Sequence, residues 1–499
     1  MKRFKSITGF CLGTLLFAGA SITALGQQMD YRYVDSSTYQ LYIHQSWDSL
    51  IEIGKTAIRN NIDYYYLRIR MAEAYNAKEQ YLLSAKSFEK AREFNQSDPN
   101  ASAGLYYAYL NSGKKTQAYH LSEQFTESLK QKLSIKPKIV DFTDVFGGYI
   151  FSNNAAENGD IILLDTITNY GEQALFGDEK YIHAGLTFNL TPSISLYAGG
   201  SLINIAKTNR FQYKTQNINK APPTQGPGGW INYRYFGEVE EHEQSFDVQI
   251  KQYELYLNGK LQLDQGWAVN LFTNLLFINS PIVQQIRSVE SVTDTLRYHP
   301  NTGHVIWTIF QQEQLDLIEK DSSFVNWVAG FSLQKDFGLI SIGLSGTYSE
   351  LSGAQQGQMG LSCFYYPLGS TKLYGQTELT GFFEFNEYLG NNQRLLFHQM
   401  IGVKLFNKTW LEAEFLSGNL NNVSIKQASV IYNLPEKINF TTGLNLHIFA
   451  TDKLEINLIY NYSDKNGFYS NQDINSGEIN EFSFDYQTHS IIGGLKWTF

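Results

Sequence analysis

The chain has little cysteine and little proline for its length. Of 499 residues, two are Cys and 10 are Pro. Cys11 lies in an N-terminal segment that we expect to be removed, so Cys363 would be the single remaining thiol, which excludes an internal disulfide. Cys363 alternates in phase with Met359 and Leu361. We therefore expect a small apolar side chain on a strand face rather than a redox or nucleophilic site.

Long apolar runs and excess basic charge are also missing. After residue 26 the sequence contains no long apolar run, which excludes a helical membrane protein. Lys and Arg total 39 against 48 Asp and Glu, for a net charge of -9, so we expect no nucleic-acid partner. Aromatic residues are abundant, with 33 Tyr and 33 Phe. Many aromatics without helical spans fit a sheet that faces lipid.

Residues 1–26 have the pattern of a secretory signal peptide. Lys2 and Lys5 belong to a basic start, an apolar segment follows, and small residues at Ala24 and Gly26 precede the expected cleavage site. A transmembrane anchor is the alternative, but the apolar segment is short and interrupted by glycine. A lipoprotein signal is disfavoured because Cys11 lies inside the apolar segment.

From residue 27 to 135 the apolar pattern has a helical period. Tyr75 and Tyr109 are 34 residues apart, as are Ala57 and Ala91. These spacings resemble the tetratricopeptide repeat family, whose first helix carries a small residue and then Tyr, and whose second carries Phe and then Ala. The matching positions are Ala72, Tyr75, Phe88, Ala91, Tyr109 and Ala118.

The resemblance is strongest for one repeat. The next repeat departs from the pattern at Ser122, where Phe is usual, and a degenerate repeat covers residues 47–61. An ordinary antiparallel helical bundle is the alternative. Because such repeats are stable only when about three of them stack, we expect this small domain to rest on another component or on the rest of the chain.

From residue 136 to 499 the apolar period changes to two. In residues 453–463, Leu454, Ile456 and Leu458 share one face while Glu455 and Asn457 share the other. Residues 253–264 and 437–448 alternate in the same way. Each run has about ten residues, the length at which a tilted strand crosses a bilayer.

The connections between these strands alternate in length, which is typical of an outer-membrane barrel. Six short turns indicate fourteen strands, within a range of twelve to sixteen, and residues 423–436 are either a strand pair above the membrane or another crossing. A soluble β-sandwich is the alternative. We therefore predict a small all-α, tetratricopeptide-like helical domain followed by an antiparallel transmembrane β-barrel. The short turns fall at 191–193, 264–266, 335–338, 367–371, 406–408 and 451–453, and the longer loops near 154–178, 207–245, 283–321 and 464–485.

Closure of the barrel would pair its first strand, near 139–152, with its last, near 485–499. Both ends of the barrel would then lie in the periplasm, together with the helical domain. Aromatic residues gather beside the short turns, as an interfacial girdle requires, among them Trp267, Trp410 and Trp497.

The inward face of the predicted barrel carries charges of both signs. A search for catalytic motifs finds no G-x-S-x-G, no H-E-x-x-H and no zinc-ligand spacing, so we expect no enzyme and no cofactor. His183 and His398 are expected to be polar lumen residues on strands two and ten. The turn-rich segment 221–230 is expected to fold inward or to cover the mouth. The candidate lumen-lining residues are Glu254, Lys260, Glu378, Arg394, Lys404, Glu412 and Glu414.

The overall plan resembles bacterial outer-membrane proteins that join periplasmic tetratricopeptide repeats to a barrel, of which the best-known export polysaccharide. This resemblance implies a transport, channel or export role in the outer membrane, with the repeats recruiting a periplasmic protein. Those exporters usually carry many more repeats, which leaves a non-conducting scaffold of an envelope complex as the alternative. A barrel enzyme is the third reading.

The C-terminal residues "IIGGLKWTF" resemble the signal that the barrel-insertion machinery recognises, with matches at Gly494, Trp497 and Phe499. Ile492 stands where a polar residue is usual. We expect deletion of Phe499 to impair assembly into the lipid of the outer membrane, measured as loss of the heat-modifiable barrel form on gels. A normal level of that form would contradict the prediction.

Overall fold

A computed structural model describes residues 29–135, 138–385, 392–473 and 476–499. The predicted signal peptide lies outside the described residues. In the described part, an N-terminal helical domain is followed by a closed antiparallel barrel of fourteen strands. The predicted fold class and strand number are both confirmed.

Helices of the N-terminal domain follow a regular spacing in the chain. The helices α1, α3 and α5 begin at residues 31, 65 and 99, and α2, α4 and α6 begin at 47, 81 and 115, so each series advances by 34 residues. Consecutive helices contact each other along the domain. No described helix is long and apolar enough to cross a membrane. The helices are α1 (Tyr31–Ile43), α2 (Trp47–Arg59), α3 (Tyr65–Ala77), α4 (Tyr81–Phe94), α5 (Pro99–Asn111), α6 (Lys115–Ser122) and α7 (Glu127–Lys132).

Small and aromatic side chains at the repeat positions form the core of the helical domain. Ala72, Tyr75, Phe88, Ala91 and Ala118 are all buried. A Cβ atom on Gly104 would lie 2.3 Å from the Phe88 ring, so α5 can approach α4 only because it carries glycine there. The sixth repeat position, Tyr109 on α5, is partly buried against the same core.

The hydroxyl of Tyr109 donates a hydrogen bond to Glu89 on α4. Burial raises the pKa of Glu89, while the Tyr109 bond favours its charged form. We expect Tyr109→Phe to remove this hydrogen bond between α4 and α5 and to destabilise the helical domain by about 0.5–1.5 kcal/mol. Tyr107→Phe, at a neighbouring side chain that is 46% exposed, is the matched control. Equal urea midpoints for the two variants would show that the Tyr109 bond contributes no stability.

The barrel strands pair in chain order and the ring closes between its ends. β1 pairs with β20 from Phe142 opposite Thr498 to Ser152 opposite Thr488, as predicted, so this seam has no free edge. The strands are β1 (Val140–Ser152), β2 (Tyr170–Thr191), β3 (Ile194–Lys220), β6 (Tyr235–Gln262), β7 (Trp267–Asn279), β10 (Ser323–Asp336), β11 (Ile340–Leu351), β12 (Ala354–Tyr365), β13 (Leu373–Phe385), β14 (Asn392–Phe406), β15 (Thr409–Ser417), β18 (Lys437–Phe449), β19 (Leu454–Gln472) and β20 (Ile479–Thr498).

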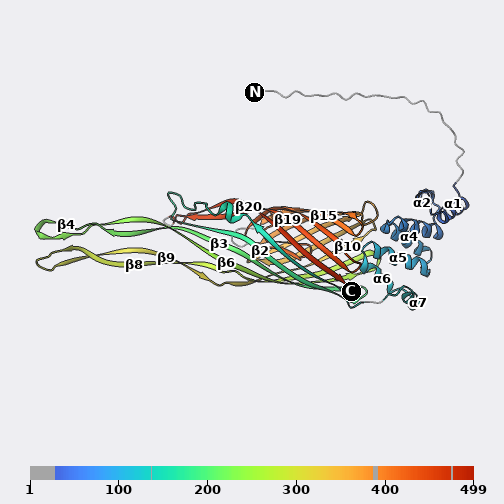
Figure 1. Ribbon diagram of the computed structural model, residues 1–499, viewed down its shortest axis with the longest axis horizontal. Helices are drawn as coiled ribbons and strands as arrows, with labels where there is room; N and C mark the ends of the chain where they lie inside the picture. Colours follow the sequence, from blue (N-terminus) through green and yellow to red (C-terminus); the bar gives the residue numbers. More distant parts are fainter. Residues whose placement is uncertain (1–28, 136–137, 386–391, 474–475) are drawn as a thin grey trace, which may run out of the picture.

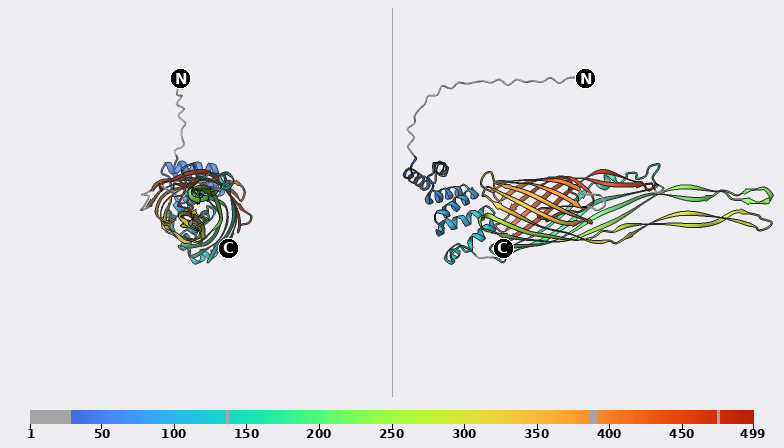
Figure 2. Two further views of the ribbon diagram at one scale, coloured as in Figure 1. Left: turned by 90° about the vertical axis from the view of Figure 1, so that its left-hand side faces the viewer. Right: turned by 180° about the vertical axis from the view of Figure 1, so that it is seen from behind.

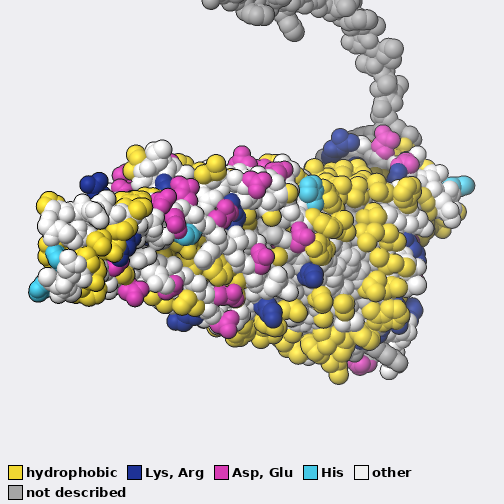
Figure 3. Space-filling model, turned by 60° about the vertical axis from the view of Figure 1, so that its left-hand side comes forward, with side chains coloured by type: hydrophobic (Ala, Val, Ile, Leu, Met, Phe, Trp, Pro, Cys, Tyr) yellow, Lys and Arg dark blue, Asp and Glu magenta, His cyan; other side chains and the backbone are white. Residues whose placement is uncertain are grey.

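Apolar side chains cover the outside of the barrel. Leu458 on β19 is 50% exposed and Leu495 on β20 is 53% exposed, whereas the alternating Asn457 is buried. Figure 3 shows hydrophobic side chains gathered over the barrel next to the helical domain. Gly494 faces inward, where an added Cβ would meet the Phe146 ring at 2.1 Å. An outward band of this kind fits the hydrocarbon of a bilayer.

The two ends of the barrel differ. At one end, here called the turn end, short turns join the strands, the seam strands carry the barrel's N- and C-terminal residues, and the helical domain lies across the opening (Figures 1 and 2). The opposite end, here called the loop end, carries the long connections. All six predicted short turns lie at the turn end.

Three of the segments predicted as long loops consist largely of regular, paired strands instead. β3 and β6 continue as one paired ribbon to Lys220 opposite Tyr235, and the β19–β20 ribbon continues to Gln472 opposite Ile479. β8 (Ile282–Tyr298) and β9 (Val305–Lys320) form a further hairpin. These ribbons satisfy their own backbone hydrogen bonds outside the apolar band, so they need no covered face.

Residues 221–230 neither fold inward nor cover the mouth, which corrects both expectations. They include β4 (Thr224–Gln225), which joins β5 (Ile231–Asn232), β8 and β9 in a separate sheet. Figure 1 shows β4 at the far tip of a long extension beyond the loop end, with β8 and β9 running along the same extension. Another segment, described next, enters the lumen instead.

Candidate functional site

The connection between β15 and β18 folds into the barrel. It contains a small hairpin of β16 (Val423–Ile425) and β17 (Val430–Tyr432), here called the inner hairpin, with its tip at Lys426–Ser429. β15 and β18 are the eleventh and twelfth strands of the ring, and the tip contacts β6, β7 and β10, the fourth to sixth. The inner hairpin therefore spans the lumen from one wall to the opposite wall.

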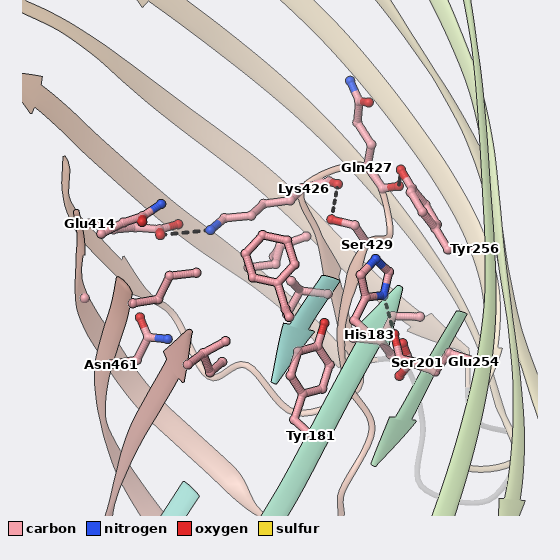
Figure 4. Close-up of a pocket in the computed structure, with 18 of the residues that line it drawn as sticks. Tyr181, His183, Ser201, Glu254, Tyr256, Glu414, Lys426, Gln427, Ser429 and Asn461 are labelled. Carbon is pink, nitrogen blue, oxygen red and sulfur yellow. Dashed lines mark hydrogen bonds and ion pairs between the residues drawn. The ribbon is translucent and has the colours of Figure 1, made fainter. Parts of the chain in front are cut away.

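Hydrogen bonds from the opposite wall hold the tip. The Tyr256 hydroxyl donates to the Gln427 carbonyl at 3.0 Å, and Asn258 Nδ2 donates to Gln427 Oε1 at 2.8 Å. Asn274 Nδ2 donates to the Ala428 carbonyl at 2.9 Å. Figure 4 shows Gln427 beside Tyr256. The wall thus recognises carbonyl oxygens of the chain itself.

Three consecutive tip residues have left-handed backbone conformations. The φ angles of Lys426, Gln427 and Ala428 are 52°, 58° and 61°. None of the three is glycine, and such conformations cost of the order of 1–3 kcal/mol each. They persist only where surrounding contacts hold them, so the tip stores strain that its release from the wall would relieve.

The stem of the inner hairpin, in contrast, is anchored by apolar packing. Leu420 and Val423 are fully buried against Phe382, Leu396 and Leu416 of the adjacent wall. The stem and the tip therefore differ in what holds them. Breaking a few hydrogen bonds frees the tip, whereas moving the stem exposes apolar surface to water.

The inner hairpin divides the lumen into two chambers. The larger has a volume of about 990 Å³ and is bounded by residues of the inner hairpin and by Lys115, Thr116 and Tyr119 of the helical domain. The smaller, of about 290 Å³, lies between the tip and strands β10–β14. The larger volume is at the upper end of the range of small-molecule sites.

Most of the sequence-predicted lumen residues line one of these chambers. Glu254, Lys260, Glu412 and Glu414 line the larger chamber and Glu378 lines the smaller. Two candidates lie elsewhere. Arg394 donates to the Asn421 carbonyl beside the stem, and Lys404 lies over the Trp410 ring, 5.1 Å from its centre.

Trp410 does not belong to the outer girdle, which corrects that expectation. It alternates with Leu411 and points to the same side as Glu412, and its Nε1 donates to the Thr371 carbonyl at 2.9 Å. The predicted girdle position fails here because the turn at 407–408 is tight, so the second residue of β15 already faces inward.

Charged side chains of the lumen are largely paired with one another. Lys426 at the tip lies 2.8 Å from Glu414, which also contacts His398 at 2.6 Å. His447 contacts Glu412 at 3.2 Å and Glu455 at 2.7 Å. The first set ties the tip to the wall on its own side. Sequence reasoning missed Lys426 and Gln427, because their segment alternates like a wall strand.

A hydrogen-bonded chain crosses the first three strands. Ser201 Oγ lies 2.9 Å from His183 Nδ1, His183 Nε2 lies 2.7 Å from the Tyr197 hydroxyl, and that hydroxyl donates to Asp144 at 3.0 Å. The backbone amides around Ser201 are engaged in strand pairing, so they cannot form an oxyanion hole. We interpret the chain as a polar lining of the lumen. His398 is on the tenth strand, remote in strand order from His183 on the second.

Metal-ligand groups are not assembled in the described part of the chain: no cluster of three or more His, Cys, Asp or Glu side chains has the geometry to hold a metal ion there.

The turn end is covered by the helical domain through polar contacts. Lys114 pairs with Asp336, and Gln117 Nε2 donates to the same carboxylate at 3.0 Å. His120 lies 3.0 Å from Asp264, and Glu79 lies 2.8 Å from Lys372. Polar interfaces of this kind allow domains to move relative to each other.

Together, an even number of antiparallel strands, an apolar outer band, short turns at one end and long connections at the other define a β-barrel of the kind found in bacterial outer membranes. No protein-family model and no curated protein matches the chain.

Solved structures of outer-membrane barrels are similar to the chain at a low level. The toluene transporter TodX of P. putida is 8% identical with a TM-score of 0.36, covering 75% of this chain and 95% of its own. A Pseudomonas aeruginosa FadL homologue is 8% identical with a TM-score of 0.37, covering 72% and 90%. The protease OmpT of Escherichia coli is 10% identical with a TM-score of 0.21, covering 73% and 99%. Likeness at this level transfers no function to this chain.

Proposed function

We propose that the chain is a transport or channel component of the bacterial outer membrane, closed at rest by two separate parts of its own structure. The observation that carries the proposal is the larger chamber, which lies between the inner hairpin and the helical domain and is lined by residues of both. A barrel that served only as an anchor would not need a strained, hydrogen-bonded tip inside it.

The orientation follows from the usual arrangement of such barrels, in which short turns face the periplasm. The helical domain would then be periplasmic, and the extension formed by β3, β6, β8 and β9 would lie outside the cell. In this orientation the inner hairpin closes the path from outside and the helical domain closes the periplasmic exit.

The helical domain supports the recruitment of a periplasmic protein. Its 34-residue spacing is that of a tetratricopeptide array. Exposed aromatic side chains lie on α1, α3 and α5. Tyr39 is 48%, Tyr66 61% and Tyr107 46% exposed, and the Arg70 guanidinium lies 5.3 Å and 6.0 Å from the centres of the Tyr39 and Tyr66 rings. A photo-crosslinking residue at Tyr66 should capture a partner that the same residue at exposed Glu93 on α4 does not. Equal capture at both positions would contradict recruitment by this face.

Single-channel recording in planar bilayers tests the channel proposal. The full chain should be closed with rare openings, and a chain lacking both residues 27–135 and residues 423–432 should conduct continuously. A correctly folded double deletion that passes no current would refute the channel and favour the alternative, a non-conducting scaffold of an envelope complex.

A further inference from the structure

The inner face of β6 carries a row of side chains with opposite charges at its two ends. Glu254, Tyr256, Asn258 and Lys260 alternate along the strand, and all four line the larger chamber. Lys260 follows Glu254 by six positions, so their Cα atoms are roughly 20 Å apart at about 3.3 Å per residue. The row therefore presents a carboxylate, two neutral hydrogen-bonding groups and an ammonium in that order.

Glu254 and Lys260 differ from the other Lys, Asp and Glu side chains of this chamber, because neither has an ion-pair partner among the described residues. Glu254 accepts a hydrogen bond from Gln252 at 2.6 Å, and the Lys260 ammonium has no hydrogen-bond or ion-pair partner among the described residues. Charges that are partly removed from water are stabilised by an opposite charge. The chamber charges that do have partners are Lys115 with Asp141, Lys426 with Glu414, Glu412 with His447, and Lys465 with Glu179 and Glu436.

The middle of the same row is occupied by a peptide unit of the protein. The backbone carbonyl of Gln427 accepts from Tyr256, and its side-chain carbonyl accepts from Asn258. These two wall residues therefore already bind amide carbonyls, and the residue they bind is in a strained conformation. Gln427 has the contacts expected of a ligand that is attached to the chain.

We propose that the larger chamber binds short zwitterionic peptides, with the ammonium at Glu254, the carboxylate at Lys260 and central carbonyls at Tyr256 and Asn258. The inference rests on the proposed channel, since a ligand reaches the chamber when the lumen opens. An extended peptide of about five residues matches the span. A single amino acid cannot reach both charges, and a neutral polyol satisfies neither.

Binding is accompanied by displacement of the tip. The peptide takes the hydrogen bonds of Gln427, and the tip then leaves its left-handed conformation. Gln427 is thus a built-in competitor, and its loss should increase the apparent affinity for the peptide, because the open state no longer competes with the closed one.

Isothermal titration of the purified full-length protein in detergent tests the proposal, with penta-alanine and its N-acetylated and C-amidated forms as probes. Penta-alanine should bind more tightly to the Gln427→Ala variant than to the unmodified chain, and capping either end should weaken binding by about tenfold, the scale for loss of a hydrogen bond to a charged group. In the Glu254→Gln variant, N-acetylation should no longer weaken binding, whereas C-amidation still should. In the Lys260→Gln variant, C-amidation should no longer weaken binding, whereas N-acetylation still should.

Glu378→Gln and Lys404→Gln are the matched controls, since they make the same charge changes at lumen residues outside the row. Both should respond to capping as the unmodified chain does. Equal binding of capped and uncapped peptides, or of maltopentaose, would overturn the proposal. So would the absence of peptide binding by a Gln427→Ala protein that retains its heat-modifiable barrel form.

Conductance separates this inference from the proposed function. If the chain without residues 27–135 and 423–432 conducts and the Gln427→Ala variant binds no peptide, the channel stands and the peptide site is wrong. If the peptide binds with the predicted dependence on both ends but a correctly folded double deletion yields no current, the site stands and the channel is wrong.

Discussion

In a chain that already lacks residues 27–135, deletion of residues 423–432, with Asn422 joined to Asn433 through two glycines, is expected to convert a closed barrel into a conducting one. The inner hairpin crosses the lumen between opposite walls, and its removal unites the chambers of about 990 Å³ and 290 Å³. Fourteen strands enclose a lumen wider than side chains alone fill. The mean current should therefore rise by roughly an order of magnitude or more, as expected when a plugged barrel becomes an aqueous pore.

Planar-bilayer recording measures this change, and a deletion in the extension provides its control. Removal of residues 224–232, at the tip far from the lumen, takes out a segment of similar length and should leave the current unchanged. Gln427→Ala should give an intermediate result, with more frequent openings of unchanged size, because it removes the side-chain contacts to Asn258 and Ser332 and leaves the stem in place. Unchanged current after removal of the inner hairpin would show that this segment is not what closes the lumen.

The second large effect is expected at the contact between Lys114 and Asp336. Their side chains are 14% and 11% exposed, so this pair is mostly buried at the interface between the helical domain and the barrel. Asp336→Asn leaves the Lys114 ammonium without its counter-charge, and loss of one partner from a buried pair costs about 3–5 kcal/mol. We expect the helical domain to leave the turn end, and α7 and the residues after it, 127–135, to become sensitive to protease.

A charge exchange separates the pair from general damage to the interface. Lys114→Asp combined with Asp336→Lys should restore protease resistance, whereas either substitution alone should not. Lys90→Asp is the control, because it makes a charge change at an exposed side chain of α4 that does not touch the barrel. If Asp336→Asn is as resistant as the unmodified chain, the remaining contacts at Asp264 and Lys372 are sufficient to hold the domain.

The barrel could be predicted from sequence because its constraints are local. Alternation such as that of Leu454 to Leu458 follows from a strand with lipid on one side and water on the other, and each short turn marks where a strand reverses. The seam between β1 and β20 followed from the need to leave no backbone edge in hydrocarbon. The alternation and the turns can be recognised within about ten residues of sequence, and the seam follows from closure alone.

The inner hairpin could not be predicted in this way. Residues 423–436 are compatible with a strand pair above the membrane or with another crossing, and the feature that turns them inward is the set of donors on the opposite wall, at Tyr256, Asn258 and Asn274. These donors are separated from the tip by about 150 residues or more, as the pairs Asn274–Ala428 and Tyr256–Gln427 show. The strands of the extension were predicted as loops for a different reason. They lie in water on both faces, so their sequence is polar like that of a loop.

The length of the β3–β6 ribbon has a consequence for how the chamber senses charge. β3 has 27 residues and is about 90 Å long at 3.3 Å per residue, three times the hydrocarbon thickness of about 30 Å. The carboxylates of Glu238, Glu240 and Glu241 near its tip are therefore many Debye lengths from Lys260, since that length is about 8 Å in physiological salt. The extension and the chamber are therefore electrically independent, so a charge change at Glu238, Glu240 or Glu241 leaves the electrostatic potential at Lys260 unchanged.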